Sequence, residues 1–178
     1  MVSKCHVVCV PFPAQGHITP MLQFAKLLHS FGFHITFVNT VYNHKRFLKS
    51  HGSEALNGLP NFQFMSIPNG LLLPSSDKEA TQDIIELCKS TNRACLGPFR
   101  DLVESVNKEG THVTCIVADA VMHFTFKVAV EFGIPMVAFW TMSACGYMGY
   151  MHYHTLADRG YFPMKCKLLF VMKELCRL

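Results

Sequence analysis

The chain has 178 residues, half of them hydrophobic, and its formal net charge at pH 7 is +4. This length and apolar content predict one folded unit with a substantial core. Lysine and arginine are scattered, without a run of like charges or a basic helix interleaved with aromatic residues, so nucleic acid is not expected as a partner.

A short apolar run and an amphipathic helix open the chain. The run Cys5 to Pro11 (C-H-V-V-C-V-P) is typical of a buried parallel strand. Thr19 is a suitable N-cap, Pro20 suits the first helical position, and Gly32 ends the apolar periodicity that follows. His17 is therefore predicted to lie in the turn between strand and helix, where open parallel sheets bind their ligands.

Strands and helices then alternate along the chain. Further strands are predicted at His34–Asn39, Asn61–Ile67, Thr114–Ala118 and Met136–Phe139. Helices are predicted from Thr40 to Ser50, Ser76 to Arg93, Gly97 to Lys108, Met122 to Phe132 and Ser143 to Ala157. This alternation implies right-handed crossovers. We therefore expect an α/β fold, a Rossmann-like and mostly parallel sheet with helices on both faces.

The loop that follows the third strand is unusually apolar. Pro68 to Ser76 (P-N-G-L-L-L-P-S-S) contains the proline and glycine that break regular structure. It also carries Leu71, Leu72 and Leu73 in succession. Three leucines in a loop suggest the wall of a binding site.

Three polar residues follow directly after predicted strands. His17 follows the first strand, Asp119 the fourth and Thr141 the fifth. The carboxyl ends of parallel strands lie at one edge of the sheet, so these side chains could converge in one crevice. A carboxylate bonded to one ring nitrogen of a histidine fixes its tautomer and stabilises the cation formed when the ring takes a proton. This predicts a proton-accepting pair.

A structural interpretation of the same residues stays open, because spacing alone does not bring them together. His17 could be an ordinary loop histidine, Asp119 a turn or cap residue, and Thr141 the start of the last helix. The sequence lacks G-x-G-x-x-G after the first strand, G-x-x-x-x-G-K-[ST] and G-x-S-x-G. Dinucleotide-binding, P-loop and serine hydrolase chemistry are therefore not indicated.

The cysteines do not form a disulfide or zinc pattern. There are eight, none in a C-x-x-C pair, and Cys5, Cys9 and Cys115 fall in runs that predict buried strands. Cys145 lies among small residues, which favours a packed thiol over a reactive one. Free thiols indicate a reducing, cytoplasmic location.

Metal, membrane and export signals are not expected either. His152 and His154 are two residues apart and point in different directions on a helix, and no other cluster has zinc spacing, so no metal site is predicted. No apolar run reaches the ~18 residues of a membrane span, and the first residues do not form a signal peptide. The protein is expected to be soluble.

Three motifs in register carry a resemblance to a known family. They are H-V-V-C-V-P-F-P-A-Q-G-H-I-T-P-M-L-Q-F-A-K-L-L, C-I-V-A-D-A-V-M and V-A-F-W-T-M-S-A-C-G-Y-M-G-Y. Together they resemble the amino-terminal half of plant UDP-dependent glycosyltransferases. The likeness is greatest to the group that includes cyanohydrin and cytokinin glucosyltransferases. It covers residues 5 to about 165 without large gaps.

The resemblance implies a GT-B fold, in which two Rossmann-like domains face each other and the first binds mainly the acceptor. His17 resembles the family's catalytic base, which takes the proton of an acceptor hydroxyl on a small plant metabolite. Asp119 resembles its supporting carboxylate. Attack opposite the departing UDP would invert the α-linked donor to a β-glycoside. The implied co-substrate is a UDP-sugar, UDP-glucose by expectation, and no cofactor is implied.

The resemblance also implies binding residues around this pair. Gly16 lies where the backbone would approach the donor, and Thr141 resembles a residue that reaches the donor sugar. Leu71 to Leu73 and Trp140 resemble parts of the acceptor pocket. These assignments come from the family's motifs and not from spacing.

The family's donor box, with its H-C-G-W-N-S segment, is missing from this sequence. From Lys165 onward the residues depart from the family pattern. We therefore expect an acceptor-binding domain over residues 1–165 and a divergent tail over residues 166–178, without the UDP-sugar-binding domain. Such a chain is expected to have little or no transferase activity alone. The alternative is a non-catalytic module that binds an acceptor or pairs with a full-length relative.

Overall fold

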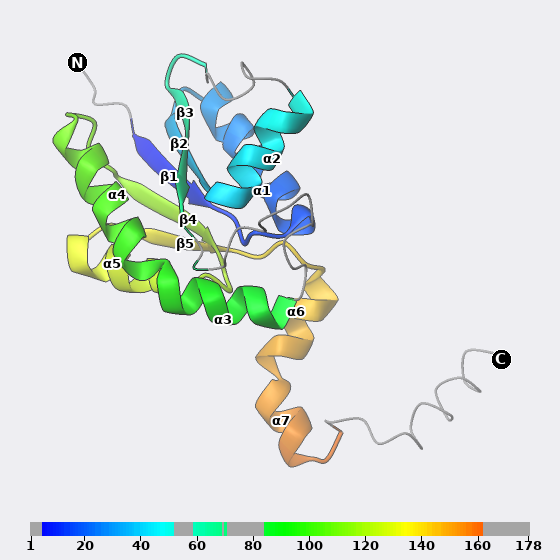
Figure 1. Cartoon of the computed structure of the whole chain (residues 1–178). Helices are drawn as coiled ribbons and strands as arrows, with labels where there is room; N and C mark the ends of the chain where they lie inside the picture. The colour runs from blue at the N-terminus through cyan, green and yellow to red at the C-terminus, as the bar shows by residue number, and fades with distance from the viewer. Residues whose placement is uncertain (1–4, 52–58, 69, 71–83, 162–178) are drawn as a thin grey trace. The chain divides into compact units, whose positions relative to one another are not determined.

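A computed structural model describes residues 5–51, 59–68, 70 and 84–161 (Figure 1). The chain divides into two compact units, Met1–Thr141 and Met142–Leu178. The first unit contains the sheet and the second contains helices, and each is described separately.

Five parallel strands form the sheet that the described residues of the first unit contain. They are β1 (His6–Val10), β2 (His34–Thr40), β3 (Phe62–Ile67), β4 (Cys115–Asp119) and β5 (Met136–Phe139). Their order is β3-β2-β1-β4-β5, and each neighbouring pair is parallel. The predicted α/β fold with a parallel sheet is confirmed. β1 lies at the centre, between strands that follow it in the sequence.

Helices cover both faces of this sheet, as predicted. They are α1 (Gln15–Ser30), α2 (Val41–His51), α3 (Ile84–Ala94), α4 (Leu96–Lys108) and α5 (Phe124–Phe132). Figure 1 shows α1 and α2 on one face and α3, α4 and α5 on the other. This division places the sheet between two separate layers of apolar side chains.

Successive side chains of β1 point to opposite faces of the sheet and so pack into both layers. Val7 and Cys9 pack into the cluster under α1, whereas Val8 and Val10 pack into the cluster under α4 and α5. All five residues of β1 are buried, which explains the apolar run from Val7 to Val10. Phe99 of α4 is fully buried in the second cluster, where a phenylalanine side chain contributes about 1.5–3 kcal/mol.

Helix α1 begins five residues earlier than predicted. Its first residue is Gln15, and the backbone N–H groups of His17 and Ile18 both donate to the Ala14 carbonyl, at 2.9 and 3.0 Å. Ala14 is thus the N-cap, without a side-chain bond to the helix. His17 therefore lies in the first turn of α1 and not in a loop, so helical hydrogen bonds fix its backbone.

The expected cap residues of α1 have other roles. The Gln15 side-chain amide donates to Thr19 Oγ1 at 2.9 Å, so this hydroxyl does not cap the helix. Pro20 lies inside the helix. It lacks an N–H, so only the intrahelical bond to the Gly16 carbonyl is lost, and its fixed φ angle is compatible with the helix. At the other end Gly32 adopts φ +88 and ends the helix as predicted.

The predicted helix from Ser76 is observed only in part. Within the described residues α3 starts at Ile84, and Ser76 and Glu79, which suggested a capping box, lie outside them. Leu71, Leu72 and Leu73 of the apolar loop lie outside them as well.

In the second unit the predicted single helix is two helices, α6 (Ala144–Met151) and α7 (Tyr153–Asp158). Ser143 caps α6 by accepting the Gly146 N–H at 3.1 Å. The backbone leaves helical geometry at His152, with φ −98 and ψ 8. Neither helix has a buried residue, so packing does not hold them as one helix.

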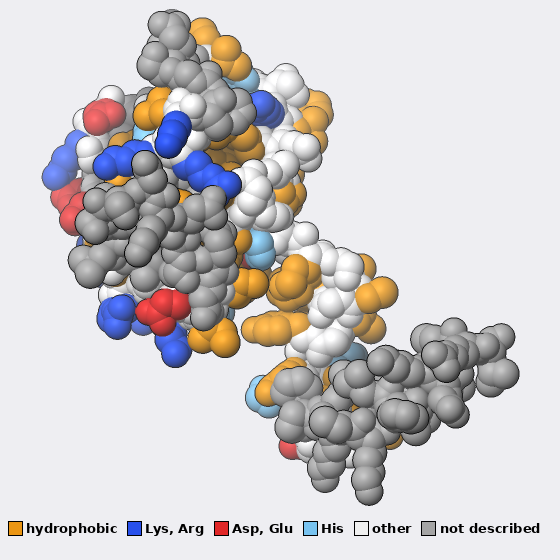
Figure 2. Space-filling model, turned by 45° about the vertical axis from the view of Figure 1, so that its right-hand side comes forward, with side chains coloured by type: hydrophobic (Ala, Val, Ile, Leu, Met, Phe, Trp, Pro, Cys, Tyr) orange, Lys and Arg blue, Asp and Glu red, His pale blue; other side chains and the backbone are white. Residues whose placement is uncertain are grey.

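Exposed apolar side chains are common in the second unit. Met148, Tyr150 and Met151 of α6 are each 58–62% exposed, and hydrophobic side chains extend along this part of the chain in Figure 2. Taking both units together, none of the helices in the described residues is long and apolar enough to cross a membrane.

The cysteines only partly follow the expected burial. Cys9 is buried and Cys115 is partly buried, whereas Cys5 is exposed because β1 starts one residue after it. Cys145 is also exposed, so the expectation of a packed thiol there was wrong. It lies in α6, which buries none of its residues.

Candidate functional site

His17 is presented by the first turn of α1, next to the carboxyl end of β1. Its ring packs edge-on against Phe12, with ring centroids 5.1 Å apart, and 20% of its side chain is exposed. Phe12 is 1% exposed, so the ring rests on a buried aromatic wall. The imidazole is therefore fixed on one side and accessible on the other.

Asp119 is the last residue of β4, and its carboxylate lies against this ring. Oδ2 is 2.6 Å from His17 Nδ1, and the Asp119 side chain is only 3% exposed. Its other oxygen, Oδ1, accepts the backbone N–H of Val121 at 3.2 Å. The carboxylate is thus buried, with each oxygen in a hydrogen bond, as a buried charge requires.

Thr141 follows β5 and completes the cluster. Its Oγ1 is 2.8 Å from His17 Nδ1 and 3.4 Å from Asp119 Oδ2. The three polar residues predicted at three strand ends therefore lie together in the first unit. The structural interpretation, in which these residues do not come together, is therefore wrong about their positions.

The contacts determine where the ring proton lies. A carboxylate only accepts hydrogen bonds, so the short contact with Asp119 requires a hydrogen on His17 Nδ1. The Thr141 hydroxyl donates to Asp119 Oδ2 and shares the Nδ1 hydrogen as an acceptor. In the neutral ring Nε2 then carries the lone pair. Within the described part of the chain no hydrogen-bond partner contacts Nε2, which leaves it available as a base.

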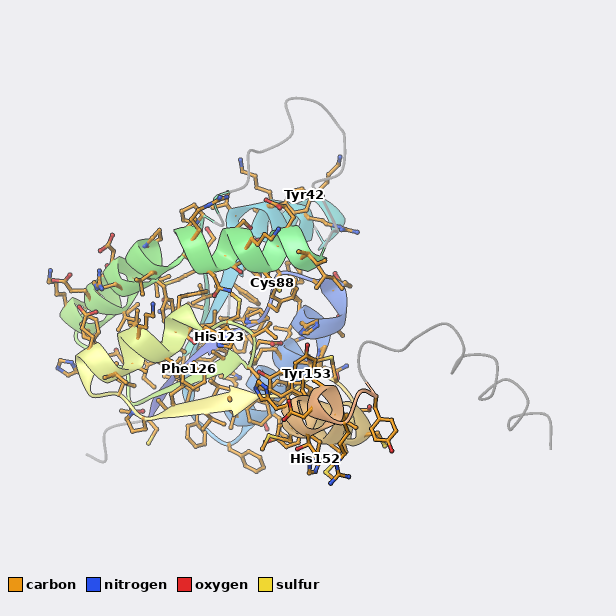
Figure 3. All side chains as sticks on the ribbon, turned by 90° about the horizontal axis from the view of Figure 1, so that it is seen from below. Tyr42, Cys88, His123, Phe126, His152 and Tyr153 are labelled. Carbon is orange, nitrogen blue, oxygen red and sulfur yellow. The ribbon has the colours of Figure 1, made fainter. Side chains whose placement is uncertain are left out.

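Sequence patterns missed two residues near this cluster. The sequence pattern gives Phe12 no role of its own, although its ring packs on His17. The sequence pattern likewise does not single out Cys88 of α3, which Figure 3 shows on the inner side of that helix. Burial raises the pKa of the Cys88 thiol, and the negative charge of Asp119 raises it further. The apolar periodicity of α3 would have identified Cys88 as inward-facing, but not its proximity to Asp119.

The remaining predicted site residues have simpler surroundings. Gly16 is exposed beside His17, and a Cβ built on it would meet nothing within 4 Å. Trp140, the residue between the end of β5 and Thr141 in the sequence, is partly buried. Among the described residues, no group of three or more His, Cys, Asp or Glu side chains could hold a metal ion.

Comparison with known proteins identifies the family. Residues 3–159 match the family model described as "Glycosyltransferase, N-terminal domain". The chain is 58% identical over 167 residues to 7-deoxyloganetin glucosyltransferase of Gardenia jasminoides, a match that covers 92% of this chain and 34% of that relative. It is 56% identical over 165 residues to (R)-mandelonitrile beta-glucosyltransferase of Prunus dulcis, with coverage of 92% and 34%.

A solved structure gives the same result at the level of the fold. The crystal structure of UDP-glucose: anthocyanidin 3-O-glucosyltransferase in complex with UDP superimposes with a TM-score of 0.71 at 25% identity. The match covers 93% of this chain and 36% of that one. The chain thus spans about a third of the length of the relatives it matches. It belongs to the glycosyltransferase N-terminal domain family.

Proposed function

We propose that the chain provides the acceptor side of an inverting UDP-glucosyltransferase that acts on a hydroxyl of a small plant metabolite. In this proposal His17 is the general base and Asp119 its supporting carboxylate. The observation that carries it is the 2.6 Å contact between His17 Nδ1 and the buried Asp119 Oδ2, with the ring still 20% exposed. Relatives named as glucosyltransferases of 7-deoxyloganetin and (R)-mandelonitrile support the substrate class.

The chemistry follows from the orientation of the ring. The acceptor hydroxyl donates to His17 Nε2 and transfers its proton there while its oxygen attacks the anomeric carbon of the donor. The new bond forms on the face opposite the departing UDP, which leaves with the electron pair of the broken C–O bond. Asp119 stabilises the imidazolium formed on His17. General base catalysis of this kind accelerates a reaction about 10²–10⁴-fold.

Other residues are proposed to position the substrates. The Thr141 hydroxyl, which contacts both members of the pair, is proposed to hold the carboxylate and the imidazole in position. From the family resemblance we further propose that Thr141 and Gly16 approach the donor sugar. Trp140 and Leu71 to Leu73 are proposed to form the acceptor pocket.

The donor is proposed to bind mainly outside these residues. The matched segment covers only 34% of the relatives, so we propose that the 178 residues alone turn over UDP-glucose slowly or not at all. The same coverage supports the alternative of an acceptor-binding module that works with a full-length relative. A cytoplasmic location is proposed because the six cysteines in the described residues are free.

A chimera tests the catalytic assignment. Residues 1–165 of this chain would replace the corresponding segment of the Gardenia relative, and glucosyl transfer to 7-deoxyloganetin would be measured. His17→Ala is expected to lower kcat about 10²–10⁴-fold. His112→Ala, which removes an exposed histidine, is the matched control and should leave the rate unchanged. Equal rates for the two variants would show that His17 is not the base.

Calorimetry on the 178-residue chain tests its proposed dependence on a donor domain. Binding of 7-deoxyloganetin without binding of UDP, and without release of UDP from UDP-glucose, supports an acceptor domain or module. UDP binding and ordinary turnover by the chain itself would overturn the proposed dependence on a donor domain.

A further inference from the structure

Strand β5 is the outermost strand on one side of the sheet in the described residues (Figure 1). The Pro135 carbonyl accepts the Ile116 N–H at 2.9 Å. The Phe139 carbonyl accepts the Ala120 N–H at 3.1 Å. Because the backbone groups of successive strand residues point to opposite sides, those of Val137 also face β4. Only the odd-numbered residues of β5 therefore bond to β4.

The other side of β5 presents backbone groups without partners. The N–H and C=O groups of Met136 and Ala138 point away from β4, and among the described residues no hydrogen bond reaches them. Pro135 does not block this side, because its missing N–H would face β4. An open edge of this kind is a template for a further strand.

The side chain at the middle of this edge is apolar. Val137 pairs in register with Val117, which packs into the cluster under α1, so Val137 points to the α1 face of the sheet. It is nevertheless 51% exposed. At the opposite edge of the described sheet, the one exposed side chain of β3 is that of Ser66. The two edges therefore differ, and the β5 edge is the apolar one.

One side of α1 extends this apolar surface. Phe24 stacks on Phe139 of β5, with ring centroids 5.1 Å apart, so this side of the helix faces β5. Leu27 and Phe31 lie within about 60° of Phe24 around the helix axis. They are 52% and 72% exposed. Leu27, Phe31 and Val137 together are called the edge strip below.

The edge strip and the free backbone groups suit a second copy of the same chain. In an antiparallel pair centred on Val137, Met136 of each copy would exchange both backbone hydrogen bonds with Ala138 of the other, which satisfies every free group of both edges. A twofold axis brings like residues together, so charges near it would repel. No residue of β5 is charged, and neither are the α1 residues on this side, Gly16, Pro20, Phe24, Leu27 and Phe31.

We propose that two copies of this chain associate through β5, antiparallel, about a twofold axis at Val137. The axis is perpendicular to the sheet, so the two sheets become one and both edge strips lie on the same face. The strip is much smaller than the about 20–30 residues that each side of a stable interface contributes, so the dimer is expected to be weak. The proposal does not rest on the proposed transferase function.

Sedimentation of the 178-residue chain over an about hundredfold range of concentration measures the association. A monomer–dimer equilibrium is expected. Amide hydrogen exchange by NMR at both ends of the range locates the contact. The Met136 and Ala138 amides should become protected only at high concentration, whereas Val137 and Phe139 should be protected throughout. A monomer at every concentration would overturn the proposal, and so would Met136 and Ala138 amides that are unprotected in a dimer or protected in the monomer.

Lysine variants test the surface. Val137→Lys places two like charges at the axis and is expected to weaken the dimer about tenfold or more. Val130→Lys is the matched control, because it makes the same change at an 82% exposed position of α5, on the other face of the sheet. Met148→Lys tests the exposed α6 in the same way. Both should dimerise like the wild type. Equal weakening by Val137→Lys and Val130→Lys, or loss of the dimer in Met148→Lys, would contradict the assignment.

A cross-link covers the case in which Val137→Lys does not fold. Facing residues of a non-hydrogen-bonded antiparallel pair have Cβ atoms about 4.5–5.5 Å apart, close to the spacing in a disulfide. Mild oxidation of Val137→Cys should therefore join two copies through position 137, which peptide mass spectrometry identifies. Val130→Cys should give no such link at position 130. No link at position 137, or equal links in both variants, would rule out the proposed pairing.

Discussion

Thr141 Oγ1 lies 2.8 Å from His17 Nδ1, although 124 residues separate them in the sequence. Thr141 follows β5 at the edge of the sheet, and His17 follows β1 at its centre. Asp119, at the end of the strand between them, accepts from both side chains. The sheet order therefore defines the site, because three neighbouring strands each deliver one member of a single hydrogen-bonded cluster.

This cluster predicts the tautomer of His17. Nitrogen NMR of the imidazole should show the neutral ring protonated on Nδ1. In Asp119→Asn the amide oxygen is expected to keep the Val121 N–H, which turns the NH₂ group toward His17. The ring must then accept at Nδ1 and carry its hydrogen on Nε2, which removes the base. In the control Thr141→Val the carboxylate remains, so Nδ1 should stay protonated. An Asp119→Asn protein with an Nδ1 hydrogen would contradict this assignment.

The buried His6 predicts a loss of stability in mild acid. Its Nδ1 donates to the Thr111 carbonyl at 2.9 Å, and Nε2 accepts from Thr36 Oγ1 at 2.8 Å. Thr36 Oγ1 in turn accepts from Gln63 Nε2, so the network is satisfied with a neutral ring. Burial lowers the pKa of His6 below 6.5, and the stacked His34 lowers it further.

A lowered folded-state pKa means that the unfolded chain binds the proton more readily. The contribution of His6 is therefore fully present above pH 6.5 and declines as the pH falls through 6.5 toward the folded-state pKa. One proton changes the free energy of unfolding by at most about 1.4 kcal/mol per pH unit. Urea unfolding between pH 7.5 and 5 measures this slope, and NMR titration gives the pKa of His6 directly. A folded-state pKa above 6.5 would refute the prediction.

Gly70 is predicted to tolerate no side chain. Its φ is +75, and a Cβ on it would lie 2.4 Å from the Cβ of Ala94. Gly70→Ala should therefore cost about 2 kcal/mol or more of unfolding free energy, from left-handed backbone strain and overpacking together. Gly97→Ala is the matched control, because Gly97 lies in α4 with open space around it. It should be neutral or stabilise the protein by up to about 1 kcal/mol. Thermal or urea unfolding of both variants compares them, and similar losses would argue against the strained position.

The thiols should differ sharply in alkylation. Burial raises the pKa of Cys9 and of Cys95 to about 12, and a fully protonated thiol is a poor nucleophile. Cys5 and Cys145 are exposed. Brief treatment with iodoacetamide at pH 8, followed by peptide mass spectrometry, should label Cys5 and Cys145 and spare Cys9 and Cys95. In denaturant all four should react. Native labelling of Cys95 would show that the core under α3 and α4 opens readily.

The strands were predictable because buried strands consist mainly of apolar residues. β1 is buried on both faces and therefore has an apolar run from Val7 to Val10, which the sequence pattern reveals directly. The start of α1 was not predictable from cap preferences, because Ala14 caps it through its backbone alone and Pro20 is accommodated inside it. The division of α6 from α7 also escaped the sequence pattern, since it depends on the absence of packing and not on a helix-breaking residue.

The candidate site was predictable in position but not in geometry. The topology rule for parallel sheets places His17, Asp119 and Thr141 at one edge. It does not reveal that Thr141 contacts the same ring nitrogen as Asp119, nor that Cys88 approaches from α3. Those relationships depend on side-chain directions across separate elements. The roles of these residues in binding and transfer stay predictions.

The central place of β1 also governs when the protein can fold during its synthesis. β1 leaves the ribosome well before its neighbour β4, because His6 pairs with Thr114, 108 residues later. At about 5–20 residues per second, that partner emerges roughly 5–20 seconds afterwards. Until then β1, all of whose residues are buried in the folded protein, has at most one neighbour in the sheet. β1 is therefore enclosed only when β4 arrives, and until then the nascent chain exposes a segment that is prone to aggregate.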